Sequence, residues 1–132
     1  MVWYHGSPVK YDESISKHGL CPPRRCPIEV ETHGDCRPNT VYLSRKFEVA
    51  QFIGLVKASG EEGLWEGLPA KSKAYVYKIL RIPKGCSTRK DTFDPADFKS
   101  IRVVGCGCIK PGFKCLVADK LSPESDCKWE KA

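Results

Sequence analysis

Hydrophobic and polar positions alternate along this chain in short runs, and the spacing within each run indicates the element that it forms. Runs rich in β-branched and aromatic residues, such as TVYLS and AYVYKILRI, have a pattern typical of strands. The same criteria predict five strands, at residues 2–4, 40–44, 74–82, 100–109 and 113–121.

Two segments have the pattern of helices. In residues 45–58, apolar side chains recur at steps of three residues, at Phe47, Ala50, Ile53 and Val56. A shorter helix is predicted to begin with an N-cap in Asp12-Glu13-Ser14 and to end at Gly19. This order of elements predicts an α+β fold with a mostly antiparallel sheet.

Between the first helix and the second strand, residues 21–39 (CPPRRCPIEVETHGDCRPN) have four prolines and no clear periodicity. They predict a long loop, a kind of segment that is often functional. The length of 132 residues indicates one domain, residues 1–132. The polar end after Leu121 is predicted to be peripheral and frayed.

Charge and apolar content limit the class of partner. The 22 Lys and Arg residues against 16 Asp and Glu give +6, which favours polyanions such as nucleic acid, nucleotides or acidic proteins. An ordinary solubility charge explains the same value equally well. No run reaches the ~20 apolar residues of a membrane helix, and Met1 leads directly into Val-Trp-Tyr without the regions of a signal peptide. We therefore expect an intracellular protein, cytoplasmic or nuclear, without a membrane partner.

The chain has eight cysteines, and without a signal peptide we expect reduced thiols, unless the host keeps cytosolic disulfides as some hyperthermophiles do. Zinc is the alternative use for them. Cys21, Cys26 and Cys36, with His33 between the last two, could form a Cys/His cluster. Their spacing departs from the usual C-x2-C pair, so plain thiols are favoured over zinc ligands.

Three motifs occur in order at the start of the chain: WYHGSP (residues 3–8), SISKHGL (14–20) and VYLSRKFEVAQF (41–52). In this order and spacing they resemble the ADP-ribosyltransferase fold, in the His-Tyr-Glu branch of diphtheria toxin and the poly(ADP-ribose) polymerases. The resemblance covers residues 2–56 by motif and residues 74–121 by pattern alone. It implies a split sheet whose crevice binds NAD in a bent conformation.

The resemblance also implies roles for the HG[ST] motif, His5-Gly6-Ser7. The family's histidine bonds the adenosine-side ribose, and the following glycine presents its backbone to the carboxamide. The chemistry of the residues agrees, because imidazole donates to or accepts from a ribose hydroxyl and glycine lets a ligand approach the main chain. For a histidine outside such a motif, a satisfied strand-end residue would be the favoured interpretation.

Tyr42 matches the family's tyrosine, which lies against the nicotinamide ring, and Phe52 matches a second aromatic on the opposite ring face. Two aromatic planes suit a flat cationic ring. Phe52 could instead pack in the core. Ser44 could bond the carboxamide or cap the following helix, and capping is the commoner use of such a serine.

The third member of the family's triad is a glutamate at the start of a late strand, and no acid stands there in this chain. The frame puts Ser100 at that position, or Ile101 or Lys99 with a shift of one residue. The nearest carboxylates are Asp94 and Asp97. Loss of such an electrostatic group typically lowers the rate by about 10² to 10³. Three options remain: single transfer assisted by the acceptor, a displaced acid such as Asp97, or an inactive NAD-binding module.

The resemblance therefore implies an NAD-dependent mono-ADP-ribosyltransferase that modifies a protein or nucleic-acid acceptor, of a size that suits a toxin-like effector. The alternative on the same fold is an NAD-dependent RNA 2'-phosphotransferase, which needs a basic set that only Arg24, Arg25 and Arg37 could imitate. The alternative outside enzymes is a Cys-rich binding module, with or without zinc.

Overall fold

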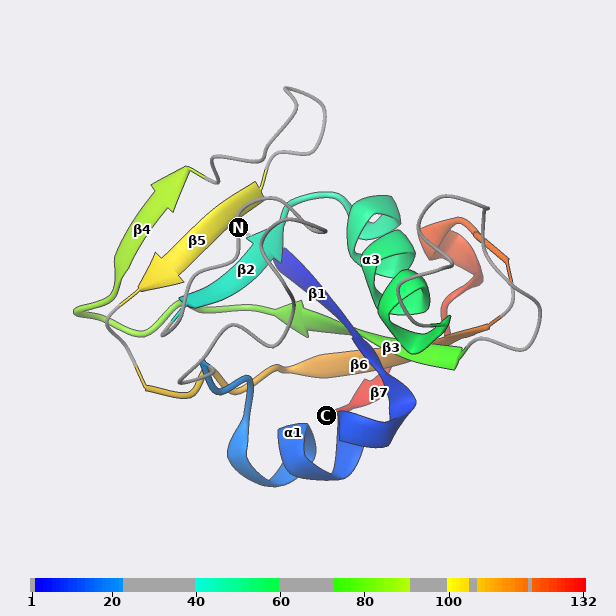
Figure 1. Cartoon of the computed structure of the whole chain (residues 1–132), viewed down its shortest axis with the longest axis horizontal. Helices are drawn as coiled ribbons and strands as arrows, with labels where there is room; N and C mark the ends of the chain where they lie inside the picture. The colour runs from blue at the N-terminus through cyan, green and yellow to red at the C-terminus, as the bar shows by residue number, and fades with distance from the viewer. Residues whose placement is uncertain (1, 23–39, 60–72, 91–99, 105–106, 119) are drawn as a thin grey trace.

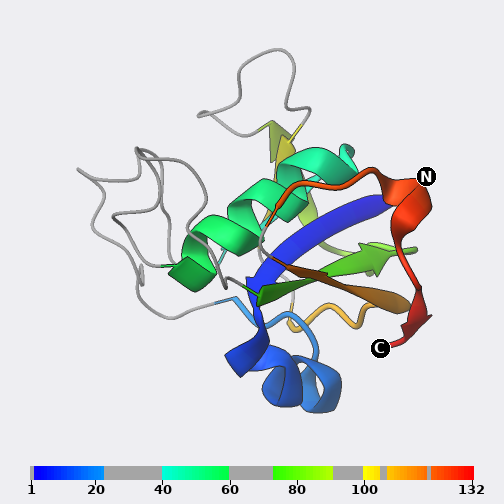
Figure 2. The same cartoon turned by 90° about the vertical axis from the view of Figure 1, so that its right-hand side faces the viewer.

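The computed structural model describes residues 2–22, 40–59, 73–90, 100–104, 107–118 and 120–132. In these residues, an antiparallel sheet of seven strands has a long helix on one face and a short helix toward the other (Figure 1, Figure 2). The strands are β1 (Trp3–Pro8), β2 (Thr40–Ser44), β3 (Lys73–Ile79), β4 (Ser87–Lys90), β5 (Ser100–Val104), β6 (Phe113–Ala118) and β7 (Glu130–Lys131). The helices are α1 (Asp12–His18) and α3 (Phe47–Ser59), with 3-10 turns η1 (Val9–Tyr11) and η2 (Glu124–Asp126).

The strand order is β4-β5-β2-β1-β3-β6-β7, and every neighbouring pair is antiparallel. This arrangement confirms the predicted α+β class with an antiparallel sheet. The last predicted strands differ in extent, because β5 ends at Val104, and Ile109 instead forms an isolated bridge with Leu20. Among the described helices, none is long and apolar enough to cross a membrane.

The ends of α1 match the sequence prediction only in part. Gly19 follows the last turn with a φ of 84°, a conformation that favours glycine, and its N–H donates to the carbonyl of Ile15. The N-cap prediction is wrong, because Asp12 is the first helical residue and no side chain caps the helix at Tyr11.

β1 and β2 meet at one point and then diverge. A single register pair, Tyr4 with Ser44, joins them, whereas six register pairs join β1 to β3. Figure 1 shows the two strands separating beyond this point. The sheet is therefore divided into a β4-β5-β2 part and a β1-β3-β6-β7 part that are joined at Tyr4.

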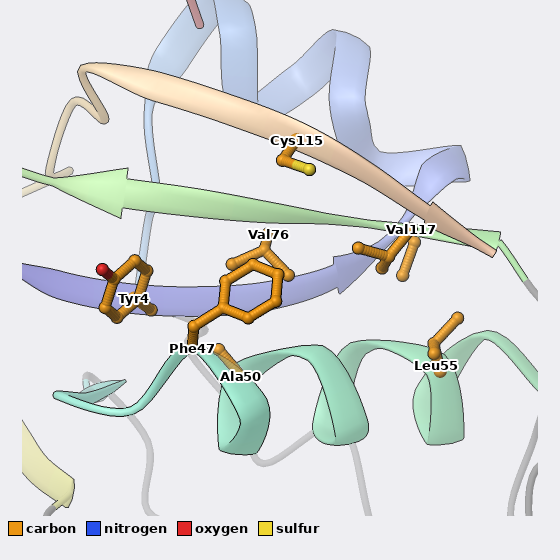
Figure 3. Packing of buried hydrophobic residues seen from close by; sticks show 8 residues of the cluster. Tyr4, Phe47, Ala50, Leu55, Val76, Cys115 and Val117 are labelled. Carbon is orange, nitrogen blue, oxygen red and sulfur yellow. The ribbon is translucent and has the colours of Figure 1, made fainter. Parts of the chain in front are cut away.

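Two hydrophobic cores lie on opposite faces of the sheet, since alternate residues of β3 belong to different cores. The α3-side core contains Tyr4, Phe47, Ala50, Leu55, Ala74, Val76, Cys115 and Val117 (Figure 3). The α1-side core contains Ile15, Leu20, Val41, Leu43, Tyr77, Ile79, Val103 and Ile109. Tyr4 of β1 belongs to the α3-side core, whereas Val41 and Leu43 of β2 belong to the α1-side core.

Every cysteine in the described part of the chain is disulfide-bonded. One disulfide joins Cys21 to Cys108, another joins Cys115 to Cys127, and Cys86 is also in a disulfide. The expectation of reduced thiols is wrong at these positions. Cys26, Cys36 and Cys106 lie outside the described residues.

The C-terminal segment is docked on the domain, so the expected frayed end is wrong. The Gln51 amide donates to the Ser122 hydroxyl over 2.9 Å, and the Trp129 ring packs against the α3-side core. The Cys115–Cys127 disulfide and the pairing of β7 with β6 attach the same segment to the sheet. Long-range contacts of this kind outweigh the polar composition of the segment.

Candidate functional site

His5 lies where β1 separates from β2, and its ring contacts the main chain of β2. Its Nδ1 is 2.8 Å from the carbonyl oxygen of Tyr42. A carbonyl oxygen only accepts, so Nδ1 carries the proton and donates it. The neutral ring therefore keeps a lone pair on Nε2, which has no hydrogen-bond partner among the described residues. That atom can accept a hydrogen bond.

The environment of His5 keeps its imidazole neutral. Burial, followed by the positive charge of Lys57, lowers the pKa of His5 to about 4 against the opposing effect of the hydrogen bond to Tyr42. The residue is of intermediate burial. At neutral pH the site accordingly presents an uncharged acceptor and no imidazolium.

Tyr42 is at the middle of β2, and its phenol leaves the strand on the α3 side. Its neighbours Val41 and Leu43 are both in the α1-side core, so strand alternation directs Tyr42 to the opposite face. Its side chain is partly buried. The contact with His5 involves the Tyr42 main chain and not its phenol.

Ser44 has a structural role at the entry to α3. Its side chain is buried, with 4 % of its surface exposed, and its hydroxyl oxygen accepts a hydrogen bond from the Lys46 N–H over 3.1 Å. Of the two roles predicted for Ser44, this contact favours the turn before the helix over the carboxamide of a ligand.

Gly6 is also explained by packing. A Cβ at Gly6 would overlap the carbonyl oxygen of Ala50 and lie 2.8 Å from the Gly54 nitrogen. Glycine is therefore required for α3 to lie directly on β1. Ser7, next in the motif, is buried in β1 and pairs in register with Tyr75.

Phe52 is on the outer side of α3. It is 37 % exposed and belongs to neither core, so the alternative that it packs in the core is wrong. No contact between Phe52 and Tyr42 is present among the described interactions. Its predicted position on the second face of a nicotinamide ring stays a prediction.

β5 contains Ser100 and Ile101, the positions at which the resemblance leads us to expect the family's glutamate. Ser100 begins the strand and pairs in register with Ser44, while Ile101 pairs with Leu43. Ile101 packs against the α1-side core. Ser100 is thus two register positions along β5 from Arg102, the partner of Tyr42. Asp97 lies outside the described residues.

The predicted metal ligands do not assemble in the described structure. Cys21 is in the disulfide with Cys108 and has no thiolate to offer zinc. Cys26, His33 and Cys36 lie outside the described residues, as do Arg24, Arg25 and Arg37 of the alternative phosphotransferase site. In the described ranges no group of three or more possible ligands is present.

A polar cluster that the sequence analysis missed lies on the α1 side. The Asp12 carboxylate accepts from the Tyr77 hydroxyl over 2.8 Å and from Lys114 Nζ over 2.7 Å. Burial, followed by this hydrogen bond, raises the pKa of Tyr77. The residues are far apart in the sequence, and only the acidic start of α1 gave a signal. The cluster attaches α1 to the sheet.

An open depression of about 630 Å³ lies beside this cluster, apart from the predicted site. Its lining is mostly from η1 and α1, with Tyr75 from β3, and includes neither His5 nor Tyr42. The position of this depression therefore gives no support to the site at the split. Comparisons with protein-family models, curated proteins and solved structures gave no match.

Proposed function

We propose that the protein is an NAD-dependent mono-ADP-ribosyltransferase that binds NAD at the split between β1 and β2. One observation carries the proposal: the strand order puts β5, β2 and β1 side by side, and the His5 ring bonds the Tyr42 main chain across the split at 2.8 Å. The three positions expected to bind and activate NAD are thus on neighbouring strands.

The chemistry of His5 supports a binding role. A neutral imidazole that donates through Nδ1 to a fixed carbonyl presents Nε2 to a hydroxyl donor. A ribose hydroxyl is such a donor. His5 is not the proton-transfer group in this proposal, because its lowered pKa makes it a weak base at neutral pH.

In the proposed reaction the bond between nicotinamide and the ribose C1' breaks and a bond from C1' to an acceptor nucleophile forms. Nicotinamide leaves as a neutral molecule with the bonding electrons, and the acceptor loses a proton. Ser100 provides no carboxylate at the position expected to stabilise the developing positive charge. The proposal therefore limits the protein to single transfer at a modest rate, with the acceptor contributing its own activation.

The acceptor is a protein or a nucleic acid in this proposal. The net charge of +6 supports attraction to an acceptor that carries negative charge. The RNA 2'-phosphotransferase alternative has no contact in the described residues that favours it.

The test combines binding and transfer. Isothermal titration calorimetry measures NAD binding to wild type, His5→Ala and Tyr42→Ala. The matched controls are His18→Ala, an exposed histidine of α1, and Tyr11→Ala, an exposed tyrosine of η1. We expect the site variants to weaken binding by about tenfold or more, the value of one good hydrogen bond or ring contact, and the controls to bind as wild type does.

Transfer is measured with labelled NAD and cell extract, followed by separate nuclease and protease digestion. Label that disappears with one digestion identifies the acceptor class. NAD binding without transfer would indicate an inactive NAD-binding module. Absence of both binding and transfer would refute the proposed function.

A further inference from the structure

The C-terminal strap, residues 120–132, reaches across the sheet to the start of β1 and the first turns of α3. Ser122 exchanges two hydrogen bonds with Gln51 of α3, which is fully buried. The Glu124 carboxylate accepts from the Tyr4 hydroxyl over 2.7 Å. The strap therefore bonds both α3 and β1, the two elements that meet at Gly6.

An aromatic contact anchors the C-terminal part of the strap. The Trp129 ring centroid is 6.3 Å from that of Tyr4 and 6.0 Å from that of Phe47. Tyr4 and Phe47 contact each other edge to face at 5.9 Å. Lys78 Nζ lies 4.2 Å from the Trp129 ring centroid and 3.8 Å from the Glu124 carboxylate. These contacts converge on Tyr4, the residue directly before His5.

The Cys115–Cys127 disulfide is the covalent link between the strap and the sheet. It joins residues that are 12 positions apart, and beyond it the strap is held by the Trp129 ring and the two-residue strand β7. Closing a loop of this length favours the docked strap by a factor of roughly 10² in the chain-entropy treatment. Without the disulfide, the strap is held by hydrogen bonds and one aromatic cluster.

The two sulfurs differ in accessibility. Cys115 is 1 % exposed in the α3-side core, whereas Cys127 is partly exposed. A thiolate of an external dithiol would attack the Cys127 sulfur, form a mixed disulfide and release Cys115 as a thiol after it takes up a proton. The second thiol of the reductant then displaces Cys127. In total the protein disulfide gains two electrons and two protons, and the dithiol is oxidised.

We propose that the Cys115–Cys127 disulfide is a redox switch that holds the C-terminal strap against Tyr4 and so positions His5 at the split. The strap acts on His5 through Tyr4 and is a positioning element. Its effect on NAD rests on the proposed function, whereas its docking does not.

The docking test is hydrogen exchange of the backbone amides of Ser122 and Ala132, which bond the Gln51 side chain and the Gly112 carbonyl across the docking contact. The samples are oxidised wild type, wild type reduced with dithiothreitol, and the double variant Cys115→Ala/Cys127→Ala. Alanine suits position 115 because a buried cysteine behaves as a small apolar residue. The matched control is Cys21→Ala/Cys108→Ala, which removes the disulfide that lies away from the strap.

We expect exchange at these amides to increase by about 10² in the reduced protein and in the strap variant, and reoxidation of wild type to restore protection. The control variant keeps wild-type protection at Ser122 and Ala132. Unchanged protection after reduction, or an equal loss in the control, overturns the switch. If the strap variant does not fold, the reduced and reoxidised wild type decide between these outcomes.

NAD titrations on the same samples test the positioning effect. We expect weaker NAD binding after reduction, with recovery on reoxidation. Exchange that increases while NAD affinity stays constant overturns the positioning of His5. If oxidised wild type binds no NAD, the proposed function fails, and the exchange experiment still decides whether the disulfide controls the strap.

Discussion

Replacing Gly6 by alanine would place a methyl group where α3 lies on β1. The added Cβ would overlap the Ala50 carbonyl oxygen and lie 2.8 Å from both the Ala50 carbonyl carbon and the Gly54 nitrogen. All three neighbours are main-chain atoms of α3. No side-chain rotation relieves the overlap, so the helix must move away from the strand.

The expected cost follows from this geometry. Overpacking a well-packed core costs about 1–3 kcal/mol, and main-chain neighbours put Gly6→Ala at the upper end, about 3 kcal/mol. With an unfolding entropy of about 2.1 cal/mol/K per residue, a chain of 132 residues loses roughly 10 °C in Tm. The movement of α3 would also disturb Phe47 and Ala50 in the α3-side core.

The assay is thermal and urea unfolding followed by circular dichroism, with two matched glycine variants. Nothing lies within 4 Å of a Cβ at Gly107, so Gly107→Ala should stay within about 1 kcal/mol of wild type. A Cβ at Gly54 would lie 3.1 Å from Gly6, an intermediate case in which the helix propensity of alanine offsets part of the clash. A Gly6→Ala protein that melts within about 2 °C of wild type would refute the reasoning.

Three further predictions concern His5, the polar cluster and the missing acid. The pKa of His5 in the folded protein is lowered to about 4, so the unfolded chain binds more protons than the folded one between pH 6.5 and 4. Acidification over this range should therefore reduce the free energy of unfolding by at most about 3 kcal/mol. His5→Gln should lack that component in urea unfolding at a series of pH values, and equal pH dependence in both proteins would contradict the assignment. Tyr77→Phe removes a buried hydrogen bond to Asp12 and should lower the free energy of unfolding in urea by about 1–2 kcal/mol. The control, Tyr75→Phe, should lower it by less than about 0.5 kcal/mol. Ser100→Glu should raise the transfer rate by about tenfold or more in the labelled-NAD assay. A variant that still binds NAD but whose transfer rate is unchanged or lower would contradict the proposed site.

The sequence predicted those strands and helices in which apolar residues recur with the period of the element. The TVYLS run is strand β2 and the next apolar-periodic segment is helix α3, as the spacing predicted, although Ile53 of the predicted apolar face is 37 % exposed. β4 was missed because its sequence, STRK, has no apolar alternation. It is a strand because it pairs with β5 over four residues. Tertiary pairing, and not local propensity, determines such an edge strand.

The sequence indicated which residues to consider for the candidate site, but it did not predict how they are arranged in space. HG[ST] and the tyrosine of β2 are visible in the sequence, but the contact of His5 with the Tyr42 carbonyl depends on where β1 and β2 separate. That separation is a long-range property of strand pairing. The docked strap depends likewise on which cysteines pair and on where Trp129 packs, and neither has a local signal.

His5 and Gly6 differ in what their substitution can show about function. Gly6 is fully accounted for by the approach of α3, so a damaged Gly6 variant would say nothing about a ligand carboxamide. His5 differs, because packing alone does not require a polar ring at the split whose Nε2 lacks a partner among the described residues. An isosteric amide at position 5 retains the packing and changes the acceptor. The functional hypothesis is therefore tested at His5, and Gly6 tests the fold that positions it.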